Sequence, residues 1–500
     1  MRAFMKISLA AGSLLLSSLA LAADPPADLI LFNGQVYTVD AARGWAHAVA
    51  VRDRKILFVG DDAPALALRG ADTRVVDLGG KMVLPGFADS HVHPVSGGVE
   101  LGLCDLNGAE TRADVERTIL EYAAAHRDRP WIVGGGWALP LYVDAHPKKE
   151  DLDRLVPDRP AALAAADGHS MWVNSRALAL AGIDSKTPDP PNGRIERDAS
   201  GEPTGTLREA ARDLVDAVVP PTSAAERLEG LRRAVELAHR FGITAVFEAS
   251  AGREDLEAYR ALDREGALHL QVRAALFVDP HPKPEVSIGE QVAQFVKLRG
   301  EDWGPHVVPA AAKLFADGVI ESGTAALLAP YLRREPLTTG ILEWEPARLK
   351  EVTRALDAAG FQIHVHAIGD RGIRETLDAL EEVAKNNGAR DRRPVLAHIQ
   401  LFDPTDLPRF RKLGVAASFQ PLWAYADPYI RDLTLPYLGP ERSRWLYPIA
   451  SMARSGAVVA AGSDWSVSSM NPLDGIEVAL TRRDPEDGPG PAWIPEERVD

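Results

Sequence analysis

The second half of the chain alternates short apolar runs with amphipathic stretches, and this rhythm constrains the fold more than any other feature. Helical patterns such as 346–359 and 372–385 separate most of the apolar runs. The runs of strand length cover residues 82–94, 242–250, 268–278, 311–318, 361–369, 393–402, 415–423 and 458–467. Alternating strands and helices indicate a parallel sheet, and eight such units predict an α/β fold with a closed (β/α)8 TIM-like barrel. An open doubly wound sheet is the alternative.

The rest of the sequence divides around this barrel. Residues 23–83 contain short strand patterns and tight turns, which predict a small N-terminal β-sandwich domain. Residues 84–104 hold the first barrel strand and the start of its loop. Residues 105–230 break the alternation and predict a long insertion near the active site. Residues 231–500 supply the remaining strands and helices of the barrel.

The N-terminus has the composition of a secretory signal peptide. Arg2 and Lys6 precede an apolar stretch at 7–19, and small residues at 20–22 suit a cleavage site. The apolar stretch is short for a membrane span. We therefore predict that residues 1–22 are removed and that the protein is exported, most simply to a bacterial periplasm. An uncleaved N-terminal anchor is the alternative.

The charge of the chain excludes two classes of partner. The formal net charge at pH 7 is −15, from 71 acidic and 56 basic residues, whereas nucleic acids and anionic membranes bind basic patches. We expect a small-molecule substrate, no nucleic-acid partner and no membrane contact after signal cleavage; a homodimer is left open. The single cysteine, Cys104, excludes an intramolecular disulfide and is interpreted as a small buried side chain.

Polar side chains collect where the predicted barrel strands end, which is where the active sites of such barrels lie. Alternate residues of a strand face the same side, so His91 and His93 converge on one spot. The other members of this set are Lys313, Asp317, His364, His366, His398 and Asp464. A lone histidine can be a hydrogen-bonded core residue, and Asp464 alone can cap a helix. Buried together, these groups would be costly unless a shared divalent metal satisfied them, so their joint placement favours a metal centre.

Other hydrolytic and nucleotide-binding chemistries lack their motifs. The sequence contains no G-x-S-x-G, H-E-x-x-H or G-x-x-x-x-G-K-[ST] pattern. The motifs present resemble those of the amidohydrolase superfamily. They are PGFADSHVH at 85–93, KLFADG at 313–318, HVHAIGDRG at 364–372, LAHIQ at 396–400 and AAGSDWSV at 460–467. HSMWVNSRAL at 169–178 and GRIERDASGEPTGTLRE at 193–209 resemble the amidohydrolase-3 branch, which includes N-substituted formamide deformylase-like proteins.

The resemblance implies a metal centre with zinc as the first candidate. Its ligands would be His91, His93, Lys313, His366, His398 and Asp464. Lys313 lies where many relatives hold a carboxylated lysine that bridges two metals; one or two ions stay open, and two are favoured if Lys313 is carboxylated. Asp89 and His364 would orient the ligands without touching the metal. His169, Trp137, Trp172 and Asp317 would bind the substrate, although the tryptophans can equally be packing residues.

The implied reaction is hydrolysis of a C–N bond in a small amide, formamide or cyclic amide. Asp464 would accept the proton of the attacking water and later return it to the leaving amine, and His398 would steady the oxyanion or the substrate. The same site could act on an ester, lactone or phosphoester, because the mechanism does not require nitrogen. A third interpretation is an exported binding protein without turnover. Relatives continue past the eighth strand with segments that complete the small β domain, so we expect the natural protein to extend beyond Asp500.

Overall fold

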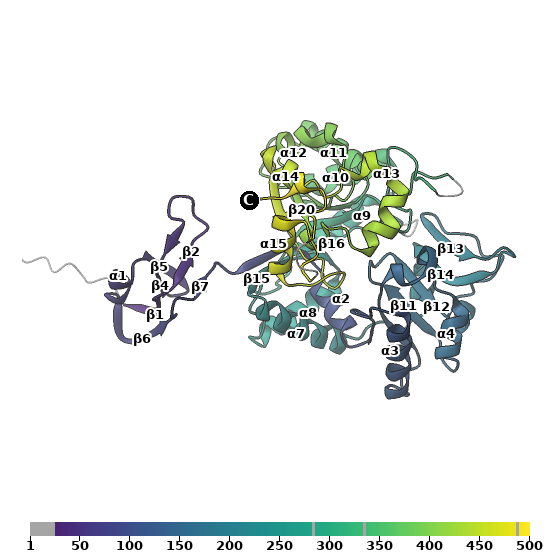
Figure 1. Cartoon of the computed structure of the whole chain (residues 1–500), viewed down its shortest axis with the longest axis horizontal. Coiled ribbons are helices and arrows are strands. Elements are labelled where there is room, and N and C mark those ends of the chain that lie inside the picture. Colours follow the sequence, from purple (N-terminus) through teal and green to yellow (C-terminus); the bar gives the residue numbers. More distant parts are fainter. Residues whose placement is uncertain (1–25, 283–285, 334–336, 487–489) are drawn as a thin grey trace, which may run out of the picture. The chain divides into compact units, whose positions relative to one another are not determined.

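The computed structural model describes four stretches of the chain, residues 26–282, 286–333, 337–486 and 490–500. The chain forms two compact units, Met1–Gly86 and Phe87–Asp500 (Figure 1). The predicted signal peptide, residues 1–22, lies outside the described residues. Among the described helices, none combines the length and the apolar character that a bilayer crossing requires.

The N-terminal unit contains two small β-sheets with the strand orders β5–β4–β1–β6 and β3–β2–β7. Asp53 and Arg54 join β4 to β5 with φ angles of 49° and 61°, as a two-residue hairpin turn of type I′ requires. The predicted small β-structured region is therefore confirmed. Its elements are β1 Ala27–Phe32, β2 Gln35–Tyr37, β3 Trp45–Ala46, β4 Ala48–Arg52, β5 Lys55–Gly60, α1 Asp62–Leu66, β6 Arg69–Asp77 and β7 Met82–Val83.

The second unit is built on an eight-stranded parallel sheet in the order β21–β20–β19–β18–β17–β16–β15–β8. Backbone hydrogen bonds bridge the two outer strands: Asp464 N–H donates to the His91 carbonyl at 2.8 Å, and His93 N–H donates to the Trp465 carbonyl at 3.0 Å. The predicted barrel is thus confirmed as a nearly closed ring. Its strands are β8 Phe87–Val92, β15 Ile243–Ala251, β16 Gln271–Phe277, β17 Val307–Phe315, β18 Gln362–Ala367, β19 Val395–His398, β20 Ala416–Phe419 and β21 Val458–Ala461.

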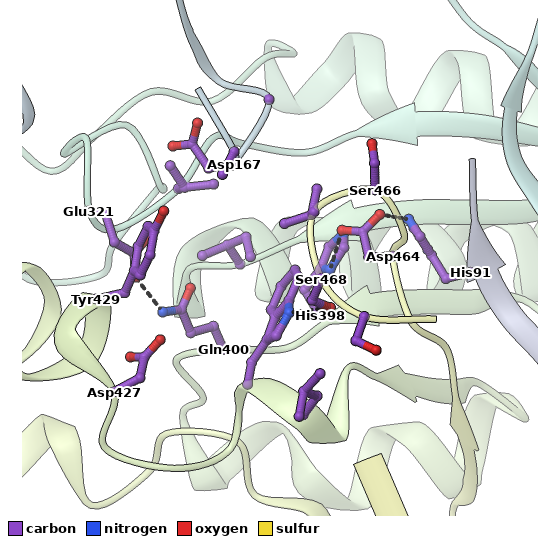
Figure 2. Close-up of a pocket in the computed structure, with 18 of the residues that line it drawn as sticks. His91, Asp167, Glu321, His398, Gln400, Asp427, Tyr429, Asp464, Ser466 and Ser468 are labelled. Carbon is purple, nitrogen blue, oxygen red and sulfur yellow. Dashed lines mark hydrogen bonds and ion pairs between the residues drawn. The ribbon is translucent and has the colours of Figure 1, made fainter. Parts of the chain in front are cut away.

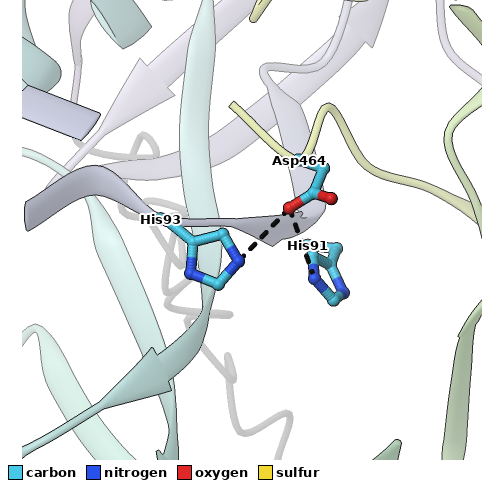
Figure 3. Close-up of side chains that lie close together, drawn as sticks. All are labelled: His91, His93 and Asp464. Atoms are coloured by element: carbon cyan, nitrogen blue, oxygen red, sulfur yellow. Dashed lines mark ion pairs between the residues drawn. The ribbon is translucent and has the colours of Figure 1, made fainter. Parts of the chain in front are cut away.

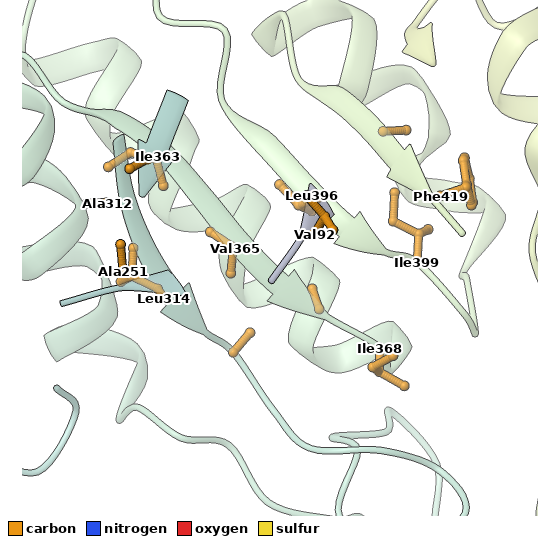
Figure 4. Close-up of a cluster of buried hydrophobic side chains, with 14 of the residues drawn as sticks. Val92, Ala251, Ala312, Leu314, Ile363, Val365, Ile368, Leu396, Ile399 and Phe419 are labelled. Atoms are coloured by element: carbon orange, nitrogen blue, oxygen red, sulfur yellow. The ribbon is translucent and has the colours of Figure 1, made fainter. Parts of the chain in front are cut away.

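Helices pack against the outer face of the barrel and bury the apolar side chains that alternate along each strand. On β18, Ile363 and Val365 join the main hydrophobic core, together with Leu314 of β17 and Leu396 of β19 (Figure 4). Because side chains alternate along a strand, the intervening residues of β18 face the interior of the barrel. The helices are α2 Pro94–Glu100, α7 Ala224–Arg240, α8 Arg253–Arg264, α9 Ile288–Arg299, α10 Pro346–Ala358, α11 Asp370–Asn386, α12 Leu407–Leu413, α13 Leu435–Ser443, α14 Ile449–Arg454 and α15 Pro472–Thr481.

The insertion after β8 forms a sheet of its own, in the order β13–β14–β12–β11–β10–β9. Trp137 and Trp172 are buried in its core beside Cys104. This sheet was not predicted from the sequence. Its elements are β9 Cys104–Asp105, α3 Arg112–Ala125, β10 Ile132–Trp137, α4 Lys149–Leu155, β11 Ala161–Ala165, β12 Ser170–Val173, α5 Ser175–Leu180, β13 Gly193–Arg197, β14 Pro203–Glu209 and α6 Asp213–Asp216.

Helix α2, which starts directly after His93, packs on α7 through two glycines. A Cβ added to Gly230 would lie 2.5 Å from the Val99 backbone nitrogen. We predict that Gly230→Ala lowers the free energy of unfolding by about 1–3 kcal/mol, the usual cost of overpacking, measured by denaturant titration. Gly289→Ala in α9 is the matched control, because its nearest neighbour would be Ser287 Oγ at 3.8 Å. Equal stability of the two variants would contradict this packing.

Candidate metal centre

A cavity of about 580 Å³ lies where the barrel strands end. Its lining combines side chains from strand ends, from the start of α2 and from the insertion, which contributes residues 166–169. Figure 2 shows part of this lining, with His91, His398 and Asp464 at one side of the cavity. Six of the predicted ligands line it: His91, His93, Lys313, His366, His398 and Asp464.

His91, His93 and Asp464 form the tightest group. Asp464 Oδ1 lies 3.2 Å from His93 Nε2 and 3.5 Å from His91 Nε2 (Figure 3). One ligand atom from each residue lies within 4.8 Å of the others, and the three side chains are buried or half-buried. Two imidazoles and a carboxylate at this spacing are a donor set that divalent zinc accepts.

The other three predicted ligands surround this group. Lys313 Nζ lies 3.4 Å from His91 Nε2. The ring centroid of His398 lies 4.7 Å from that of His91 and 4.5 Å from that of His366. The structure therefore brings together donors from β8, β17, β18 and β19 and from the loop after β21.

Supporting contacts orient the rings of His366 and His398. His398 Nδ1 lies 2.8 Å from Gln420 Oε1, and His366 Nε2 lies 3.1 Å from the Gly318 carbonyl oxygen. Each of these nitrogens donates its hydrogen to an oxygen acceptor. A neutral imidazole carries one such hydrogen, so His398 Nε2 and His366 Nδ1 are left without a proton. A metal-binding histidine needs this arrangement.

His91 and His93 also have partners behind them. His91 Nδ1 lies 2.8 Å from His364 Nε2, and His93 Nδ1 lies 3.8 Å from Glu248 Oε1. Asp89 accepts hydrogen bonds from the backbone N–H groups of His91 and Ser463, both at 3.0 Å. These contacts leave the Nε2 atoms of His91 and His93 facing Asp464.

The electrostatics suit a bound cation. Burial lowers the pKa of Lys313 to about 7 and that of His398 to about 4. Burial alone would raise the pKa of Asp464, but the hydrogen bond from His93 and the positive charge of neighbouring groups lower it overall. Burial also lowers the pKa values of His91 and His366, whereas the hydrogen bond and charge of Asp464 outweigh burial and raise the pKa of His93. Neutral imidazoles and an ionised carboxylate are the states that metal binding requires, and a divalent ion would displace the proton of His93, so the residues fit such an ion.

The insertion places His169 in the cavity. Its ring centroid lies 5.2 Å from that of His366, and its Nδ1 lies 2.8 Å from Glu209 Oε2. Burial lowers the pKa of His169, but the charge and hydrogen bond of Glu209 outweigh it and raise that pKa to about 9. The pair is therefore an ion pair at neutral pH.

Three predicted substrate-binding residues do not line the cavity. Trp137 Nε1 donates to the Leu163 carbonyl and Trp172 Nε1 to the Lys148 carbonyl, each at 2.8 Å, inside the insertion. Both tryptophans therefore pack in the core of the insertion, which is the second interpretation given for them above. Asp317 is buried and accepts backbone hydrogen bonds from residues 326, 368 and 369, so its carboxylate holds loops together.

Several residues of the site escaped sequence reasoning. Glu248 and Gln420 each follow apolar strand residues. A single polar residue at the end of an apolar run was the one sequence signal that could have marked them as site residues. The cavity wall also contains acidic side chains from loops, where no periodicity marks them. Examples are Asp167, Glu321 and Asp427.

Comparisons with known proteins agree with this geometry. The family model described as the amidohydrolase family matches residues 74–500. The chain is 34% identical to Protein LONG AFTER FAR-RED 3 of Arabidopsis thaliana, over 97% of this chain and 82% of that protein. It is 27% identical to an N-substituted formamide deformylase of Arthrobacter pascens, over 91% of this chain and 84% of that protein.

A solved structure is similar along nearly the whole chain. It is the crystal structure of an uncharacterized metal-dependent hydrolase from Pyrococcus furiosus, with a TM-score of 0.70 and 26% sequence identity. The similarity covers 94% of this chain and 91% of that chain. The resemblance identified from the sequence motifs is thereby confirmed.

After loading with zinc, His93→Asn should retain much less of the ion than the wild type, because the variant removes a donor and leaves Asp464 with one imidazole fewer. The zinc-to-protein ratio after dialysis, measured by inductively coupled plasma mass spectrometry, should fall toward zero. His239→Asn, at an exposed helical histidine, is the matched control and should keep the wild-type ratio. Equal ratios in the two variants would argue against this site.

Proposed function

The chain belongs to the amidohydrolase family, and from this premise we propose that it hydrolyses a C–N bond in a small amide, formamide or cyclic amide. The observation that carries the proposal is that all six predicted ligands line one cavity and that three of them, His91, His93 and Asp464, lie close enough to hold one ion. The similarity to an N-substituted formamide deformylase supports the choice of a C–N bond.

One or two divalent ions, with zinc as the first candidate, would be held by His91, His93, Lys313, His366, His398 and Asp464. A bound divalent ion polarises a carbonyl and makes water acidic enough to react near neutral pH. Two ions are favoured if Lys313 is carboxylated. Carboxylation needs a neutral amine, and the pKa of Lys313, lowered to about 7 by burial, supplies one.

Asp464 is the proposed acceptor of the proton from the attacking water. Its carboxylate stays ionised beside His91 and His93, so it can take a proton at Oδ1 or Oδ2. It would then return that proton to the nitrogen of the leaving amine as the C–N bond breaks. His398, oriented by Gln420, would turn its unprotonated Nε2 toward the metal ion.

The substrate would lie between these residues and His169 of the insertion. Trp423 stacks on the His398 ring, with centroids 5.5 Å apart, and gives the cavity an apolar wall. Hydrolysis of an ester, lactone or phosphoester by the same residues is the second candidate, since nothing in the proton transfer requires nitrogen. A binding protein without turnover is less favoured, because a binder has no need of both Lys313 and Asp464.

Zinc- or manganese-loaded protein should hydrolyse members of a panel of N-formyl amines, N-acyl amines and lactones. On the best substrate, Asp464→Asn should lower kcat by about 10²–10⁴, the usual contribution of a positioned acid–base group. Asp391→Asn, an exposed carboxylate paired with Arg393, should keep wild-type kcat. Unaltered turnover in Asp464→Asn would remove the proposed mechanism, and preference for lactones would favour the second candidate.

We also propose that the protein is exported and acts in the periplasm on a small molecule. The charged start, short apolar stretch and small residues of 1–22 support export, and the net charge of −15 supports the absence of a nucleic-acid partner. Expressed in a Gram-negative host, the protein should appear in the periplasmic fraction with Ala23 as its first residue by N-terminal sequencing. Cytoplasmic protein starting at Met1 would contradict export.

A further inference from the structure

The insertion presents His169 to the cavity on a rigid support. His169 immediately precedes β12 and Glu209 ends β14, and the Glu209 backbone N–H donates to the His169 carbonyl at 3.0 Å. Their side chains meet through the contact between Nδ1 and Oε2 at 2.8 Å, with 13% and 9% of the two side chains exposed. The carboxylate therefore fixes both the tilt of the imidazole and the nitrogen that turns away from the cavity.

The barrel holds the other oxygen of the same carboxylate. Thr324 Oγ1, in the segment after β17, donates to Glu209 Oε1 at 2.5 Å and accepts from the Val319 backbone N–H at 3.0 Å. Gly318 leaves room for this contact, because a Cβ there would lie 2.2 Å from Thr324 Oγ1 and 2.5 Å from Glu209 Oε1. Glu209 is thus shared between the insertion and the barrel.

The backbone of Glu209 supports a special role. Its φ angle is 45°, in the left-handed region that a residue with a side chain rarely adopts. Such a conformation persists only where the contacts of the surrounding structure stabilise it, and it occurs most often at functional sites. His398 and Asp464 share this feature, with φ angles of 78° and 53°.

Resting on the proposed hydrolysis, we propose that Glu209 and Thr324 are positioning residues that hold His169 with Nε2 directed at the amide group of the substrate. His169 Nδ1 is engaged by Glu209, so Nε2 is the ring nitrogen left for a ligand in the cavity. The ring of His169 lies beside that of His366, so a ligand bound by the metal-binding residues would lie within its reach. The hydrogen bond from Thr324 to Glu209 joins the His169–Glu209 pair to the barrel.

The test uses acetohydroxamate, a small amide-like metal chelator, and isothermal titration calorimetry on zinc-loaded full-length protein. His169→Ala and Glu209→Gln should each weaken binding about tenfold, the equivalent of one good hydrogen bond. The double variant should bind within about twofold of either single variant, because Glu209 acts only through His169. Thr324→Ser, which keeps the hydroxyl, should bind more tightly than Thr324→Val.

Zinc content and thermal unfolding are measured in parallel. Zinc content should not change in Glu209→Gln, whereas the variant should still unfold cooperatively but at a lower temperature, because it loses a buried ion pair. On any substrate found, the same variant should lower kcat more than it raises KM. Glu301→Gln, a surface partner of Arg253, is the matched control. Additive losses in the double variant, wild-type affinity in Glu209→Gln, or no binding to the wild type would each overturn the inference. Zinc and acetohydroxamate binding without turnover of any amide would remove the proposed function and leave the positioning role intact.

Discussion

Burial of ionisable side chains in the mouth of the barrel is the constraint on which the rest of the structure depends. His91, Lys313, His366, His398 and Asp464 are each no more than 6% exposed. Groups of this kind are destabilising in a barrel interior unless each polar atom has a partner. The surrounding contacts with His364, Gly318, Gln420, Glu248 and Asp89 follow from that need. They satisfy the atoms that face outward and leave the inward-facing atoms to one another and to the metal ion of the proposed function.

The same constraint explains why the insertion has its own core. A flexible loop could not hold an imidazole beside buried ligands, whereas a sheet with Trp137 and Trp172 inside it can. Thr324 then ties that sheet to the barrel through a single carboxylate. The insertion acts as a second scaffold that reaches the cavity through residues 166–169.

Sequence reasoning succeeded where periodicity reports on geometry. Strand–helix alternation predicted the barrel, and the spacing of His91 and His93 predicted that they share a face. It failed where position depends on long-range contacts. The β10 and β11 segments IVGGGW and AALAA are rich in glycine and alanine, so they carry little strand preference and the insertion sheet was missed. A tryptophan looks alike in sequence whether it covers a core or a cavity, and Asp317 serves loops that meet it only in three dimensions.

The bridge between the outer strands has a consequence for biosynthesis. Two of the backbone hydrogen bonds that complete the ring involve Asp464 and Trp465, while their partners are His91 in the first barrel strand, β8, and His93 directly after it. A ribosome must therefore synthesise the chain through Trp465 before β8 gains its second neighbour. Until then the nascent protein carries an open strand edge, the kind of surface that chaperones protect from aggregation. Asp464 joins His91 and His93 in the same step of synthesis that completes the ring.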